Sequence, residues 1–184
     1  MKRTVWVLLL PALVISGCSS GPETITFDTP LPSCDAFVAT LTDLGMPGGA
    51  PKVQAQSSAS PTGLNCVYSP AEQADPPALA AATVQVSRPN VKSDEQDPRE
   101  RFGSLLADTD CTGTADTNPE LPGGASCYEL IADTTATATV SAVTRQSGIR
   151  ASVIWTDPTA SPEQLKTDSL AKANALAEAV IAKL

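Results

Sequence analysis

The chain has 184 residues, with 20 acidic and 12 basic side chains and a formal net charge of −8 at pH 7. This length suits one domain with a real hydrophobic core, and an acidic chain without a basic cluster lacks the electrostatic footprint of a nucleic-acid binder. The chain has no histidine, so the usual catalytic triads and the commonest general base are missing. It also lacks a GxSxG nucleophile elbow. We therefore expect a protein that is not an enzyme, holds no cofactor and binds no nucleic acid.

The first residues follow the order of an export signal. Lys2 and Arg3 are basic, residues 5–15 form an apolar run, and small residues follow. This run is only about half of the roughly 20 residues that a membrane-spanning helix needs. We expect residues 1–17 to be a signal peptide rather than a permanent span.

The segment ISGC, residues 15–18, resembles the lipobox of bacterial lipoproteins. The resemblance implies cleavage after Gly17 and a diacylglyceryl group on Cys18, the first mature residue. Two or more acyl chains, palmitate among them, hold a protein stably on a membrane. The acyl chains on Cys18 are therefore expected to insert among the membrane lipids and to anchor the protein on the extracytoplasmic side of the cell membrane. The alternative is a free cysteine beside an ordinary cleavage site.

Four cysteines remain after Cys18. Exported proteins fold in an oxidising compartment, so an even number of cysteines indicates disulfides. Four cysteines give two disulfides, with three possible connectivities. We favour sequential pairing, Cys34 with Cys66 and Cys111 with Cys127. A zinc site would need CxxC-type spacing or histidines, which the chain does not have. Each bridge should stabilise the domain by about 3 kcal/mol.

Residues 18–31 are small, polar and proline-bearing, which suits a tether that extends at most about 40 Å. Residues 32–184 are expected to form a single extracytoplasmic domain. Its first element is a helix that Ser33 caps and that Gly45 and Pro47 end. The apolar residues of this helix recur at helical spacing: Phe37, Leu41 and Leu44.

Short strands are expected where β-forming residues alternate between Pro and Gly punctuation. They are residues 52–56, 64–69, 82–88, 127–133, 136–145 and 149–157. The break at residues 146–148 has the length of a hairpin turn and predicts antiparallel pairing. Residues 69–81 and 108–126 are expected to be loops, and residues 94–108 a second helix.

The C-terminal segment predicts a long helix. Ser161 is its cap, Pro162 its first-turn proline and Gln164 the capping-box partner. An apolar stripe follows, made of Leu165, Leu170, Ala173, Ala177, Val180, Ile181 and Leu184. The predicted class is α+β, an antiparallel sheet of about five to six strands packed by an N-terminal and a long C-terminal helix, with two disulfides.

The order of these parts resembles an actinobacterial lipoprotein family of unknown function. The resemblance rests on the lipobox, on PSCDAFVATLTDLGMP, LNCVYS and PGGASCYEL, and on the closing Ala-rich helix. Such lipoproteins are similar to sandwich folds of the PsbP and Mog1 type, which bind or escort partners rather than turn over substrates. The family supplies no established catalytic residue. Cys127 stands where a small residue is more usual, which makes the second disulfide a local variant.

The loop DTDCTGTADTNPE has oxygen-bearing residues at calcium-loop positions, with Gly113 at position 6. The candidate ligands are Asp108, Asp110, Thr112, Thr114 and Asp116. Position 12, which should be a bidentate carboxylate, is Pro119, and Glu120 comes one residue late. The alternative is an ordinary Asp- and Thr-rich turn loop.

Tyr68 and Trp155 lie on predicted strands and are the candidate residues of a ligand pocket, the alternative being that both simply pack in the core. We expect a monomeric, non-catalytic binding lipoprotein that holds a small apolar or cell-envelope ligand between sheet and helix. The second hypothesis is an accessory lipoprotein that docks an envelope protein complex through a sheet edge or loop. An enclosed apolar pocket would favour the first, and an exposed apolar patch on a solid core the second.

Overall fold

The computed structural model describes residues 30–47, 52–56, 63–72, 75–88, 116–144 and 146–184, with the backbone alone for residues 52–56. The predicted signal peptide, Cys18 and the predicted helix over residues 94–108 lie outside these ranges. No helix among the described residues is long and apolar enough to cross a membrane.

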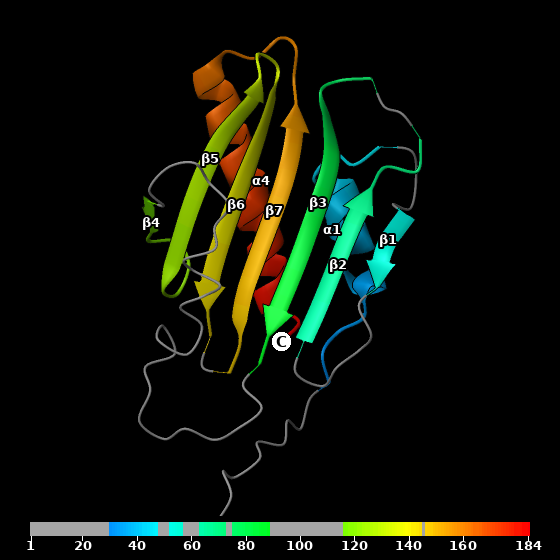
Figure 1. Cartoon of the computed structure of the whole chain (residues 1–184), viewed down its shortest axis with the longest axis vertical. Coiled ribbons are helices and arrows are strands. Elements are labelled where there is room, and N and C mark those ends of the chain that lie inside the picture. The colour runs from blue at the N-terminus through cyan, green and yellow to red at the C-terminus, as the bar shows by residue number, and fades with distance from the viewer. Residues whose placement is uncertain (1–29, 48–51, 57–62, 73–74, 89–115, 145) are drawn as a thin grey trace, which may run out of the picture.

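One seven-stranded sheet forms the body of the protein, with the strand order β1-β2-β3-β7-β6-β5-β4 (Figure 1). Its strands are β1 (Lys52–Gln56), β2 (Gly63–Ser69), β3 (Ala78–Ser87), β4 (Asp116–Asn118), β5 (Gly124–Ala132), β6 (Thr135–Val143) and β7 (Gly148–Thr156). All neighbouring strands are antiparallel. The α+β class and the β6–β7 hairpin are thus confirmed, and the sheet exceeds the expected five to six strands.

Two segments that we expected to be loops contain strand. β3 begins at Ala78 rather than at Ala82, and β4 together with the first residues of β5 falls within residues 108–126. Alanine is somewhat depleted in strands, but the start of β3 pairs with the end of β7, Ala78 opposite Thr156. Hydrogen bonding to a strand far away in the sequence therefore overrides the local preference.

Helices cover one face of the sheet (Figure 1). The N-terminal one begins as a 3-10 helix, η1 (Cys34–Phe37), and continues as α1 (Val38–Asp43). The Ser33 side chain makes no capping hydrogen bond, contrary to expectation. Gly45, with φ of +96°, ends the segment in a conformation that glycine adopts without strain.

The C-terminal helix, α4 (Pro162–Ile181), has the predicted start. Ser161 Oγ accepts a hydrogen bond from the Gln164 backbone N–H at 3.2 Å. The Gln164 side chain donates forward to Asp168 Oδ1 at 2.8 Å. The capping box is therefore only half formed, because its glutamine bonds one turn further along the helix.

The hydrophobic core lies between α4, the N-terminal helix and the sheet. α4 packs mainly on β6 and β7. Apart from Trp155, the residues of these two strands that face the helices are nearly all small and at most 1 % exposed: Ala136, Ala138, Val140, Ala142, Ile149, Ala151 and Val153. Ala173 and Ala177 of α4 are fully buried as well. Small side chains on both partners let the helix pack close to the sheet.

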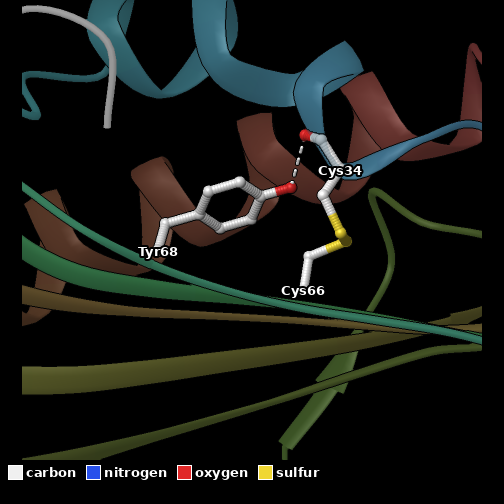
Figure 2. Close-up of a disulfide and its surroundings, with 3 residues drawn as sticks. All are labelled: Cys34, Cys66 and Tyr68. Atoms are coloured by element: carbon white, nitrogen blue, oxygen red, sulfur yellow. Dashed lines mark hydrogen bonds between the residues drawn. A yellow bond between two sulfur atoms is a disulfide. The ribbon is translucent and has the colours of Figure 1, made fainter. Parts of the chain in front are cut away.

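A disulfide joins Cys34 of η1 to Cys66 of β2, across a sequence separation of 32, and confirms the first predicted pairing (Figure 2). Tyr68 points to the same region, and its hydroxyl donates to the Cys34 carbonyl oxygen at 2.8 Å. This is the one disulfide with both partners among the described residues. Cys127 is also disulfide-bonded, and Cys111, its predicted partner, lies outside them.

Candidate functional site

A hollow of about 380 Å³ opens on the surface between the end of α1 and the middle of α4. We call it the Trp155 hollow, and its lining residues are Leu44, Trp155, Asp168, Ala171 and Lys172. Leu44 caps the C-terminus of α1, Trp155 lies near the end of β7, and the other three belong to α4. Three elements that are far apart in the sequence therefore meet at this site.

Trp155 forms the floor of the hollow at the edge of the core. It points to the helix-covered face of the sheet, pairs with Leu79 on β3 and Ala136 on β6, and is 7 % exposed. Its indole Nε1 is buried and has no hydrogen-bond partner within the described ranges. Gly45 crosses over the ring, where a Cβ would lie 3.5 Å from Cζ3. The Gly45 carbonyl also accepts from the Leu79 N–H at 3.0 Å, which ties this turn to β3.

Lys172 connects α4 to both neighbouring elements. Its ammonium lies 4.0 Å from the centroid of the Trp155 ring, within the range of a cation–π interaction. The same Nζ donates to the Leu44 carbonyl oxygen at 2.8 Å, at the end of α1, where a positive charge is favourable. Burial lowers the pKa of Lys172, and the negative charge of Asp168 offsets part of that effect.

The hollow offers two opposite charges and an apolar wall. Asp168 and Lys172 are four residues apart on α4 and so lie on one side of the helix. Leu44, Ala171 and the indole supply apolar surface. The lining contains one carboxylate and no Ser, Cys or His. The lining therefore offers both charge complementarity and apolar contact to a ligand.

The structure separates the two aromatic residues that we predicted to share a pocket. Trp155 lines the hollow, whereas Tyr68 does not and is fully buried in the core. Burial, aided by the charge of Asp35, raises the pKa of Tyr68 well above the ordinary tyrosine value. The hydroxyl stays protonated and acts as a structural donor to Cys34.

Lys172 and Asp168 were not predicted as site residues, because in the sequence they look like ordinary charged positions on an exposed helix face. A usable signal was present nevertheless. Leu165 is fully buried, and Asp168 and Lys172 follow it at i+3 and i+7, so both flank the apolar stripe. Charged residues at the edge of a buried apolar stripe lie against the core and are only partly exposed to solvent.

The predicted calcium loop falls almost entirely outside the described residues. Of its candidate ligands only Asp116 is described, as the exposed first residue of β4, opposite Ser126. Asp108, Asp110, Thr112 and Thr114 lie outside. In the part of the chain that is described, no three His, Cys, Asp or Glu residues are grouped so as to hold a metal ion.

The similarity of this chain to known proteins is slight. No family model and no curated protein matches the chain. Among solved structures, a mutant of the protein Mog1 is similar, with a TM-score of 0.35 and 14% sequence identity. The match covers 69% of this chain and 78% of that chain. A likeness of this size supports no inference about function.

We expect the fluorescence of Trp155 to change as Lys172 loses its proton, with a midpoint below the ordinary lysine value of 10.5, because burial lowers this pKa. Deprotonation removes the charge that lies over the indole ring. The measurement is an alkaline titration of the full chain with Trp6→Phe, so that Trp155 is the only tryptophan whether or not residues 1–17 have been removed.

Tyrosinate should not disturb this titration. The chain has two tyrosines, and burial raises the pKa of both Tyr68 and Tyr128. Lys172→Met should abolish the transition, while Lys166→Met, at an exposed position of α4, should keep it. Persistence of the transition in the Lys172→Met chain would show that it does not arise from this contact.

Proposed function

We propose that this chain is a membrane-anchored, non-catalytic lipoprotein that binds a small envelope ligand in the Trp155 hollow, on the outer face of the cytoplasmic membrane. The observation that supports ligand binding is the Lys172 ammonium, held between the Trp155 ring and the Leu44 carbonyl at a surface hollow. The export signal and the lipobox-like ISGC segment support the anchor.

The packing of the interior favours a ligand at the surface over one between the sheet and α4. Leu165, Leu176 and Val180 of α4 and Val153 of β7 are all fully buried. Their side chains occupy the space between sheet and helix in which an apolar ligand was expected. The Trp155 hollow lies at the margin of this packed region, and its volume falls within the range of small-molecule sites, about 300–1,000 Å³.

The proposed anchor keeps the hollow near the membrane. Leu31 already packs against the core, so the tether consists only of the residues between Cys18 and Pro30. A dozen residues extend to about 40 Å at most. The ligand would therefore be a component of the membrane surface or of the adjacent cell wall.

Native mass spectrometry of the full chain, extracted from the membranes of a lipoprotein-processing host in mild detergent, tests this proposal. We expect an acylated protein mass and a further mass that is lost on denaturation. The further mass should be absent from Lys172→Met and present with Lys166→Met. Cys18→Ser should lose the acyl mass and leave the membrane fraction. An unacylated chain would overturn the anchor, and a bare acylated chain would overturn ligand binding.

Docking of an envelope protein is a second candidate, favoured by an apolar tip at the end of β5. Leu130 and Ile131 are 43% and 56% exposed and are the large hydrophobic side chains exposed in the described part of the chain. The register between β5 and β6 shifts between Leu130 and Ala132, which is typical of a bulge. If docking is correct, Leu130→Ser with Ile131→Ser should abolish a protein complex and leave any small-molecule mass unchanged.

A further inference from the structure

We infer that the ligand of the Trp155 hollow is a small zwitterion with an apolar side, whose anionic group meets Lys172 and whose cationic group meets Asp168. The apolar side would lie on Leu44, Ala171 and the indole ring. This inference rests on the proposed function, in which the hollow is a binding site, and it specifies the chemical class of the ligand.

Lys172 has no close counter-charge among the described residues. An ammonium has three N–H donors, and one of them is used by the Leu44 carbonyl while the ring of Trp155 meets the charge from another side. Among the described residues no carboxylate forms an ion pair with it, and Asp168 acts on it only through a longer-range attraction. An ammonium that has lost part of its hydration in this way is stabilised by a nearby anion.

Asp168 supplies the opposite charge one helical turn away. Its carboxylate accepts one hydrogen bond from the Gln164 side chain at 2.8 Å. An ionised carboxylate has about four acceptor sites, so it can still accept from a ligand ammonium. Residues four apart on a helix are separated by about 6 Å. The two charges of the ligand should therefore lie at a comparable spacing, with one charged group at each end of a short linker.

Other ligand classes fit the hollow less well. A simple anion would meet the Asp168 carboxylate and the net charge of −8 of the whole chain. A simple cation would meet Lys172. An uncharged apolar molecule would remove water from both charged groups without replacing its hydrogen bonds. A zwitterion compensates both charges and is not repelled by the net charge of the protein.

Two sources in a cell envelope share this chemistry. One is a short peptide, whose two ends carry an amine and a carboxylate. The other is a phosphoethanolamine head group, which carries an amine and a phosphodiester. Both carry the charge pair that the hollow would recognise, and the experiment separates the two sources.

The test uses the full chain with Trp6→Phe in an uncharged maltoside detergent, with Trp155 fluorescence and calorimetry as readouts. The peptide probes are alanyl-leucine, its N-acetyl form and its C-terminal amide. The head-group probes are glycerophosphoethanolamine and the anionic glycerophosphoglycerol. We expect a zwitterion from at least one series to bind tenfold or more tightly than its singly charged analogues. The tighter of the two zwitterions then identifies the source.

Two variants assign the charges. Asp168→Asn should reduce the affinity for the zwitterion to that for the N-acetyl form, and Lys172→Met should reduce it to that for the amide. Lys166→Met and Glu163→Gln, at exposed positions of the same helix, should leave it within twofold. Equal binding of zwitterions and singly charged forms, or binding by none of the probes, would overturn the inference.

The native mass measurement separates failure of this inference from failure of the proposed function. A small-molecule mass that depends on Lys172, combined with no preference for zwitterions, would overturn the ligand class and leave the binding function standing. A bare protein mass together with no binding of any probe would overturn both.

Discussion

Replacing Cys34 and Cys66 together by alanine should lower the free energy of unfolding by about 3.5 kcal/mol. The bridge spans 32 residues of sequence, and a cross-link over that length removes the corresponding loop entropy from the unfolded chain. Urea unfolding of the double variant and of the parent chain, followed by circular dichroism, measures the difference.

The double variant is preferable to a reducing agent. Cys127 is disulfide-bonded too, so a reductant would act on more than one bridge. Removing both partners also avoids leaving one buried free thiol. Thr42→Ala, at an exposed position of α1, provides a surface control that should change stability by no more than about 0.5 kcal/mol. A loss below about 1 kcal/mol in the double variant would contradict the expectation.

The Cys34–Cys66 disulfide matters for the candidate site as well as for stability. It holds η1 on β2, and the Tyr68 hydroxyl holds the Cys34 carbonyl at the same point. α1 follows η1 directly and ends at Leu44, whose carbonyl accepts from Lys172. The position of the Lys172 ammonium over Trp155 therefore depends on a chain of contacts that begins at the bridge.

Local sequence signals predicted the elements that depend on neighbouring residues. Ser161 and Pro162 marked the start of α4, and the short break at residues 146–148 marked the β6–β7 hairpin. The Cys34–Cys66 pair followed from cysteine parity and the preference for sequential pairing. Each of these predictions needed only a few adjacent residues or a simple count.

Features that depend on long-range pairing could not be predicted in this way. The central position of β7 between β3 and β6 makes Ala78 part of a strand. The hollow likewise combines residues from α1, β7 and α4, so Trp155 was identifiable as an aromatic strand residue but its neighbour Lys172 was not. Tyr68 and Trp155 both lie on strands, but Tyr68 is fully buried beside Cys34 of η1, whereas Trp155 lines the hollow at the margin of the core.

We expect Leu176→Ala to lower the free energy of unfolding by 2–5 kcal/mol, towards the upper part of that range. Leu176 is fully buried on α4, which packs mainly on β6 and β7. The facing residues of those strands are mostly alanine and valine, which have no long side chain that could move into the space left by leucine. The measurement is chemical unfolding of the variant and the parent chain under the same conditions.

Two matched variants separate the cavity from other effects of substitution in the helix. Leu176→Met nearly conserves volume and should cost less than about 1.5 kcal/mol. Glu178→Ala, at an exposed position two residues away, should change stability by no more than about 0.5 kcal/mol. If Leu176→Ala cost no more than Leu176→Met, the interior under α4 would have to relax freely or contain unused space. That result would reopen the possibility that a ligand is held between the helix and the sheet, which the filled interior argues against.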